Sequence, residues 1–199
     1  MYGLPISTER KQQLPKKAIY AKFDLKTSQR ECFDADIARI DIVAVVSPVT
    51  VPALSEGSEV KEFYVLDVQM KHREYDAKNI LLLTRLIAQN MVFALRYEDR
   101  VQFAVFHAKL FTTAWQSAEQ ATLPLSGLNL DVVWENMVKR IGQIEVAGDN
   151  SLATQIAEDD RRAKLLAQIA TLERKMANEK QPRRKREYFE LIKKLKGLA

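Results

Sequence analysis

The sequence predicts an α+β fold, in which a mixed sheet with helices packed on it is followed by a basic antiparallel helical hairpin. Three observations lead to this expectation. Residues 62–109 contain an alternating strand, an amphipathic helix and two more strand-like runs. Residues 129–141 have the apolar spacing of a second amphipathic helix. Residues 161–199 repeat apolar side chains at intervals of three and four, as paired helices do.

The composition indicates one ordinary domain with an appendage. The chain has 199 residues, 47% of them hydrophobic, which suffices for the core of a domain of about 150 residues. No apolar run reaches the roughly 18 residues that span a bilayer, and residues 1–13 lack a signal-peptide core. The single cysteine, Cys32, forms no internal disulfide, and two histidines with one cysteine are too few for a zinc site. We therefore expect a cytoplasmic protein without a membrane partner.

The first elements are expected to be short. The polar segment before Pro15 is expected to form one or two helical turns that start at Ser7 or Thr8. Leu14 should lie outside them, because proline biases its predecessor out of a helix. Residues 18–23 have the pattern of a short strand. Ser28 and Glu31 have the spacing of a capping box, which predicts a helix that ends near Ala38.

Two long strands are expected next. Residues 40–47 are apolar on both faces, which predicts a central position in the sheet. Residues 63–71 alternate, so that one face begins with Phe63 and Val65 and then turns polar. The opposite face is largely apolar and contains Tyr64, Leu66, Val68 and Met70.

A helix and a hairpin follow the second strand. Asp76 is expected to cap a helix over residues 77–89, whose apolar side chains fall on one side. Two further strand-like runs cover residues 91–97 and 100–109. Only Glu98-Asp99 separates them, which predicts a tight hairpin.

The next helix is expected to start at Asn129 or Asp131 and to end near Ile141. Its apolar side chains recur at helical spacing and should face the core. They are Val133, Trp134, Met137, Val138 and Ile141.

The turn Gly148-Asp149-Asn150 predicts a boundary between a core domain, residues 1–147, and a hairpin, residues 148–199. Gln181-Pro182 separates the two helices of the hairpin. A narrow apolar seam wrapped in charge requires a partner helix, and we expect each helix to pair with the other. The seam residues are Leu165, Ile169, Leu172 and Met176, facing Tyr188, Leu191, Leu195 and Leu198.

Charge is distributed unevenly along the chain. Residues 161–199 contain 13 Lys and Arg but 4 Asp and Glu, whereas the whole chain has a net charge of +5. The first 160 residues are therefore mildly acidic and the hairpin is strongly basic. This hairpin is a candidate binding surface for nucleic-acid phosphates or for an acidic partner protein, and both alternatives stay open. The candidate binding residues are Arg183, Arg184, Lys185, Arg186, Lys193, Lys194 and Lys196.

The polar face of the strand over residues 63–71 is the one candidate for catalysis. Asp67, Gln69 and Lys71 follow one another on it, and Asp41 lies on an expected neighbouring strand. This row resembles nucleases of the PD-(D/E)xK type, in which the oxygens bind Mg²⁺ and the lysine positions the attacking water. No Pro-Asp precedes the strand and Gln69 has no charge, whereas a solvated strand end gives the same row. We therefore keep a metal-dependent nuclease as the alternative interpretation.

Three sequence features together suggest a family resemblance. They are Leu14-Pro15-Lys16-Lys17, the segment over residues 127–131 that leads into a helix with Trp134-Glu135-Asn136, and the basic hairpin. On these features the chain resembles the bacterial and archaeal domain of unknown function 4391 family over nearly its whole length. The resemblance implies genes beside helicases and DNA methyltransferases in restriction-like or phage-defence clusters. Its motifs are structural rather than catalytic.

The sequence and the resemblance together favour a non-catalytic accessory subunit of a DNA-acting complex. We expect its hairpin to bind a partner protein, such as a helicase or DNA methyltransferase, or nucleic acid. This interpretation requires no cofactor, whereas the nuclease alternative requires Mg²⁺.

Overall fold

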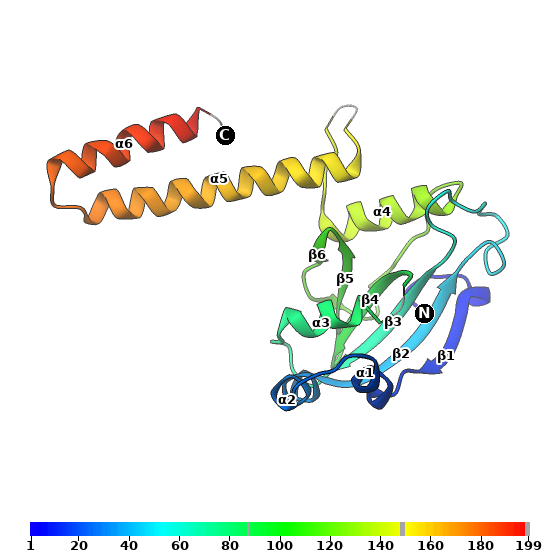
Figure 1. Cartoon of the computed structure of the whole chain (residues 1–199). Coiled ribbons are helices and arrows are strands. Elements are labelled where there is room, and N and C mark those ends of the chain that lie inside the picture. The colour runs from blue at the N-terminus through cyan, green and yellow to red at the C-terminus, as the bar shows by residue number, and fades with distance from the viewer. Residues whose placement is uncertain (87, 148–149, 198–199) are drawn as a thin grey trace. The chain divides into compact units, whose positions relative to one another are not determined.

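The computed structural model describes residues 1–86, 88–147 and 150–197, and the chain divides into two units, Met1–Glu145 and Val146–Ala199. The first unit is a mixed sheet with helices, and the second contains two paired helices (Figure 1). The predicted fold class is therefore confirmed. The predicted boundary residues Gly148 and Asp149 lie outside the described residues. No helix among the described residues is long and apolar enough to cross a membrane.

The described strands of the first unit form one seven-stranded sheet in the order β1-β2-β3-β4-β5-β6, with β7 also pairing with β5. All neighbouring strands are antiparallel except β3 and β4. These two are parallel because a helix carries the chain back between them. The strands are β1 (Glu9–Gln13), β2 (Ile37–Val46), β3 (Phe63–Met70), β4 (Asn90–Tyr97), β5 (Arg100–His107), β6 (Lys109–Thr112) and β7 (Gln116–Ser117).

Helices α1 (Lys16–Lys22), α2 (Thr27–Asp36) and α3 (Ala77–Leu83) pack on one face of the sheet. The apolar face predicted for β3 points toward them, so its two predicted faces are confirmed. The apolar side chains on this side form a buried hydrophobic core. Among the largest fully buried side chains in this core are Ile19, Phe33, Ile40, Leu66, Ile80, Leu83, Phe93 and Leu95.

The N-terminal elements differ from the expectation. Residues 18–23 were expected to form a strand, but they belong to helix α1, which begins after Pro15. Helical spacing places Ile19 in the core and Phe23 beside it, and this packing overrides the strand propensity of the apolar run. The polar segment before Pro15 has one 3-10 turn (Ile6–Thr8) and then the exposed edge strand β1.

Helix α2 and strand β2 meet earlier than expected. The helix starts at Thr27, where Gln29 Oε1 accepts a hydrogen bond from the Lys26 backbone N–H at 3.0 Å, and not at a Ser28 cap. It ends at Asp36, so that β2 begins at Ile37. Strand β2 is not central but lies second in the sheet, between β1 and β3, and its alternating burial shows that one of its two faces is only partly covered. The central strands are β3 and β4.

The predicted hairpin at Glu98-Asp99 is confirmed, with a left-handed φ of 51° at Glu98. The expected strand over residues 100–109 is broken at Ala108, where φ is 61° and the chain turns back. Helix α3 has its predicted cap, since Asp76 Oδ1 accepts from the Lys78 N–H at 2.9 Å. The helix ends at Leu83 rather than near residue 89, and Ile87 lies outside the described residues.

Helix α4 (Leu130–Gly142) covers part of the other sheet face, above β5 and β6 (Figure 1). Its predicted cap is confirmed, because Asn129 Oδ1 accepts from the Val132 N–H at 3.0 Å. The Trp134 ring lies 5.6 Å from the ring of Phe63. All five residues of the predicted apolar stripe are buried.

Asp131 does not cap α4 but binds the loop before β3. Its carboxylate accepts hydrogen bonds from the backbone N–H groups of Ser58, Glu59 and Val60 at 2.5, 3.1 and 2.8 Å. The bond from Val60, with those from Ser58 and Glu59, lowers the pKa of Asp131 to about 2. At Gly57 an added Cβ would lie 2.1 Å from Asp131 Oδ1, so the loop requires glycine there.

Replacing Asp131 with Asn should lower the melting temperature at pH 7, because the amide has only one oxygen acceptor for these donors. The folded-state pKa of Asp131 lies below its ordinary value of 3.8. Its stabilising contribution is therefore complete above about pH 4 and is lost as the pH falls toward about 2. Thermal unfolding should show the difference between wild type and variant shrinking over that window. A difference that persists at pH 2, or that the exposed control Asp24→Asn also shows, would contradict the assignment.

The second unit is an antiparallel hairpin of α5 (Leu152–Asn178) and α6 (Pro182–Lys196), as predicted. The seam on α5 agrees with the prediction, with Ile169 as its buried centre. On α6 the prediction was wrong at one position, since Ile192 is buried whereas Leu191 is 48% exposed. Tyr188, Ile192 and Leu195 at spacings of four and three form this side of the seam. Leu198 lies outside the described residues.

Replacing Ile192 with Ala should open the hairpin, because truncating a buried isoleucine costs about 2–5 kcal/mol. Hydrogen–deuterium exchange of the α6 backbone amides, measured by mass spectrometry on the whole chain, should accelerate. The neighbouring variant Leu191→Ala is the matched control and should leave exchange near that of wild type. Equal acceleration in the two variants would mean that the seam is assigned wrongly.

Candidate functional site

Helix α6 places four of the seven predicted basic residues at its N-terminal end and the other three, Lys193, Lys194 and Lys196, in its last turn. Pro182 starts the helix, and its first turn contains no acidic residue. Arg183, Arg184, Lys185 and Arg186 all have exposed side chains. The N-terminal end of a helix is already positive, so each positive side chain there lowers the stability of the helix by about 0.3 kcal/mol or more. These charges do not stabilise the helix.

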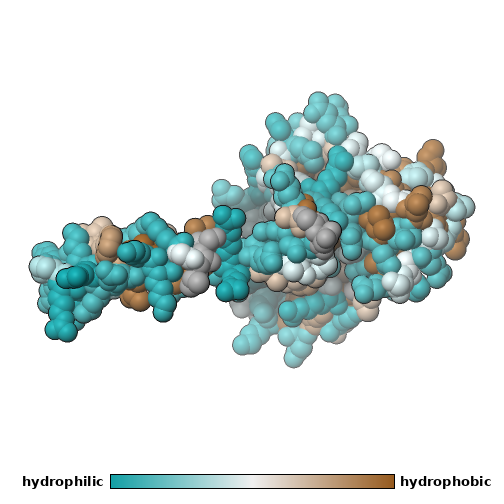
Figure 2. Space-filling model, turned by 90° about the horizontal axis from the view of Figure 1, so that it is seen from above, coloured by the Kyte–Doolittle hydropathy of each residue, from teal (hydrophilic) through white to brown (hydrophobic). Residues whose placement is uncertain are grey.

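Helical periodicity sorts the basic side chains of α6 by direction. With Tyr188, Ile192 and Leu195 facing α5, a period of 3.6 residues turns Arg186 and Lys193 to the opposite side. Arg183 and Lys194 lie beside them on the same exposed half. The hairpin surface drawn in Figure 2 is mostly hydrophilic.

Few of the seven predicted binding residues are neutralised within the described part of the chain. Arg183 Nε lies 3.5 Å from Glu187 on the same helix. Lys196 Nζ lies 2.8 Å from Glu173 on α5, so this lysine fastens the two helices together. For brevity, the six exposed cations other than Lys196 are named the basic face of the hairpin, although Arg184 and Lys185 project closer to the seam than the other four. They are Arg183, Arg184, Lys185, Arg186, Lys193 and Lys194.

The second candidate region is the polar face of β3. Asp67 stands directly opposite Asp41 of β2, so the structure brings these two predicted residues together. Gln69 stands opposite Arg39 on one side and Arg96 of β4 on the other. Asp41, Asp67 and Gln69 line one open groove of about 660 Å³, which Arg39 and Arg96 also line.

Both carboxylates in this groove are held by arginines. Arg39 binds Asp41 through Nε and Nη2 at 2.7 and 2.8 Å. Asp67 is 2% exposed and accepts from Arg96 Nε at 3.2 Å and from the Tyr2 hydroxyl at 3.0 Å. Burial, followed by the charge of Asp67, raises the pKa of the Tyr2 phenol well above its usual value. Asp67 is therefore not part of a solvated strand end, whereas Gln69 is exposed.

Lys71 does not join the groove. Its backbone N–H donates to the Asp36 carbonyl at 2.8 Å, just beyond the end of β3. Burial acts to raise the pKa of Asp34, but hydrogen bonds from Lys16 and Tyr20 and the charges of Lys16 and Lys71 lower it. The charge of Lys71 therefore acts on the carboxylate of Asp34, which lies on helix α2.

These positions do not fit the Mg²⁺ site of the nuclease alternative. Asp41 and Asp67 are both paired with guanidinium groups, and Lys71 is elsewhere. Among the described residues, no group of three His, Cys, Asp or Glu side chains is arranged to hold a metal. What the groove offers to a ligand is arginine and amide N–H groups. Sequence reasoning missed Arg39, Arg96 and Tyr2, although the alternation of Arg39 with Asp41 on one strand was a visible signal.

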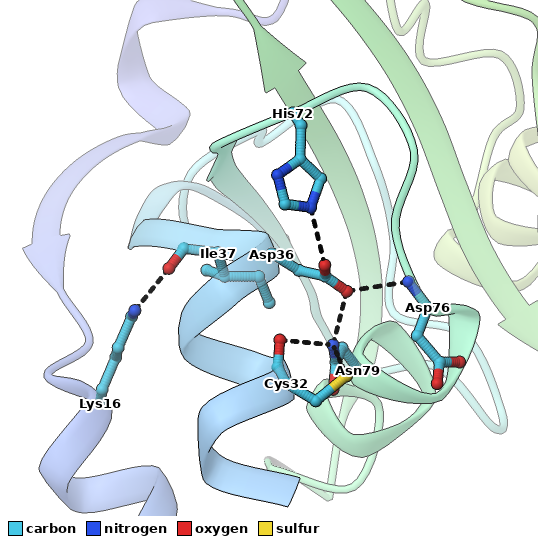
Figure 3. A network of polar contacts seen from close by, with 7 residues as sticks. All are labelled: Lys16, Cys32, Asp36, Ile37, His72, Asp76 and Asn79. Atoms are coloured by element: carbon cyan, nitrogen blue, oxygen red, sulfur yellow. Dashed lines mark hydrogen bonds and ion pairs between the residues drawn. The ribbon is translucent and has the colours of Figure 1, made fainter. Parts of the chain in front are cut away.

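A third polar cluster joins α2 to the segment after β3 (Figure 3). The Asp36 carboxylate accepts from Asn79 Nδ2 at 2.7 Å and the Asp76 N–H at 2.8 Å, and contacts His72 Nε2 at 2.9 Å. Burial acts to raise the pKa of Asp36, but these bonds outweigh it and lower that pKa. The Asn79 amide also donates to the Cys32 carbonyl at 3.4 Å. Both oxygens of the Asp36 carboxylate have hydrogen-bond partners within the fold, so the cluster has a structural role.

Taken together, the fold and these surfaces define an α+β protein with a basic helical hairpin. The chain belongs to the family described as Domain of unknown function (DUF4391), whose model matches residues 2–198. The resemblance inferred from the sequence motifs is thereby confirmed. No curated protein and no solved structure matched the chain.

Replacing Asp36 with Ala should destabilise the first unit by about 3 kcal/mol, because the buried Asn79 amide and the part-buried Asp76 N–H would both lose their acceptor. Chemical denaturation followed by fluorescence measures this change. His72→Ala is the control, since its ring is half exposed and its loss should cost less than about 1 kcal/mol. Similar losses in both variants would contradict the central role of the Asp36 carboxylate.

Proposed function

We propose that this protein is a non-catalytic accessory subunit of a DNA-acting complex and that the basic face of its hairpin binds the phosphate backbone of nucleic acid. The observation that supports this most is the exposure of four consecutive cations at the N-terminal end of α6, where they oppose the helix dipole. Side chains that cost helix stability and find few partners within the chain are suited to an external anion.

Backbone binding by such a face would be independent of base sequence. Lysine and arginine contacts to phosphates displace condensed counterions and fix position, but they do not read base edges. In this proposal the hairpin holds the complex on nucleic acid, whereas another subunit supplies the catalytic activity and the recognition of base sequence. A helicase or DNA methyltransferase of a restriction-like or phage-defence system is the proposed partner, and the cytoplasm the proposed location.

Neutralising the basic face should weaken nucleic-acid binding and its salt dependence together. We expect the wild-type affinity for a DNA duplex to fall steeply between about 50 and 200 mM salt, with a slope near −0.9 per phosphate neutralised. Changing Arg183, Arg184, Lys185 and Arg186 to Ala should reduce that slope by up to about four contacts. Fluorescence anisotropy of a labelled duplex measures both quantities.

The matched control removes four exposed cations from the first unit, namely Lys17, Lys26, Arg73 and Lys78. This variant has the same net charge as the hairpin variant, so a general charge effect would weaken binding equally in both. Binding that is absent at low salt, or equally reduced in the two variants, would contradict the nucleic-acid proposal. Capture of an acidic protein by the hairpin alone would then explain the exposed charges.

A further inference from the structure

Three neighbouring strands place a row of hydrogen-bond donors across the open part of the sheet. Arg39 of β2, Gln69 of β3 and Arg96 of β4 stand opposite one another in the strand register. Strands are about 4.8 Å apart, so the two arginine Cα atoms are separated by roughly 10 Å with the glutamine between them. We name these residues the donor row. All three line the groove of about 660 Å³.

The carboxylates beside the donor row fix its guanidinium groups. Asp41 holds Arg39 by two bonds and Asp67 holds Arg96 by Nε, which leaves the other N–H groups of each arginine for a ligand. Asp67 is itself buried and fixed by the Tyr2 hydroxyl. Arg96 is therefore preorganised, while its side chain stays 41% exposed to the groove. Preorganised donors bind an anion without first paying to order themselves.

The charges that line the groove select an anion. Both sheet carboxylates are paired, and the edge strand β1 adds the exposed cations Arg10 and Lys11 to one acidic residue, Glu9. Two guanidinium groups that line one groove match a phosphate, whose several oxygens can accept hydrogen bonds from more than one side, better than a single carboxylate. The groove is also larger than a phosphate, and its volume lies in the range of small-molecule sites.

We propose that the donor row binds the phosphate group of a nucleotide-sized ligand, with Arg39 and Arg96 on either side of it and the Gln69 amide beneath it. The remainder of the ligand would lie along the groove toward β1. This site belongs to the first unit and does not depend on the hairpin. A free mononucleotide and the 5′-phosphate at a strand end present the same group.

The experiment measures binding of AMP to the whole chain by isothermal titration calorimetry, with adenosine as the matched ligand lacking phosphate. We expect saturable AMP binding with a Kd of about 1 mM or tighter, and none of adenosine. Arg39→Gln and Gln69→Ala change exposed side chains and should fold. Arg39→Gln should weaken binding by about tenfold or more, the effect of losing charged hydrogen bonds. Arg96→Lys keeps a cation near Asp67 and should also weaken binding.

The control variant Arg73→Gln removes an exposed arginine outside the groove and should bind AMP like wild type. The proposal is overturned if AMP does not bind, if adenosine binds equally, or if Arg39→Gln binds as wild type does. The hairpin variant with four alanines should keep AMP binding, which separates this site from the proposed function. The hairpin variant also allows AMP to be compared with a 5′-phosphorylated oligonucleotide. Tighter binding of the oligonucleotide would identify the end of a nucleic-acid strand as the ligand. Tighter binding of AMP would identify a free nucleotide.

Discussion

The buried carboxylate of Asp67 constrains how the strands and the N-terminal segment of the first unit assemble. A charge in the middle of a central strand is costly unless it is paired and hydrogen-bonded. Here Arg96 comes from the parallel neighbour β4 and the Tyr2 hydroxyl from the N-terminal segment. The Tyr2 ring also packs edge-on against Phe103, and the Leu123 N–H donates to the Tyr2 carbonyl. One carboxylate thereby fixes the parallel strand pair and the segment that closes the second face.

Much of the fold followed from short-range patterns. The two faces of β3, the hairpin at Glu98-Asp99 and the stripe of α4 were predicted because each depends on periodicity or on a cap within a few residues. Helix α1 was missed because a short apolar run such as residues 18–23 fits either structure, and burial of Ile19 against the sheet decides between them. Leu191 was placed in the seam for a similar reason, since Ile192 next to it fits the spacing equally well.

The candidate sites differ in how much the sequence could say. The basic face of the hairpin was predictable, because consecutive charges on one helix need no tertiary information. The groove was only half predictable, since Asp41, Asp67 and Gln69 were found as a polar row but their partners were not. Arg39 and Arg96 come from strands on either side of β3, and strand register across a parallel pair depends on the length of the crossover through α3. Strand pairing thus brings Arg96 to Asp67, whereas Arg39 binds Asp41 of its own strand.

The two proposed anion sites rest on opposite physical arrangements. Along α6 the cations are exposed and their long side chains have many rotamers, and the four at its N-terminal end oppose the helix dipole. This arrangement suits sequence-independent contact with a polyanion. In the groove the guanidinium groups are fixed by carboxylates on a rigid sheet, which suits one anion in one orientation. Positively charged side chains thus have two different uses in this chain. The seam packs α6 against α5 and leaves the cations of α6 exposed, whereas Asp41 and Asp67 hold the groove arginines and leave some of their N–H groups for a ligand.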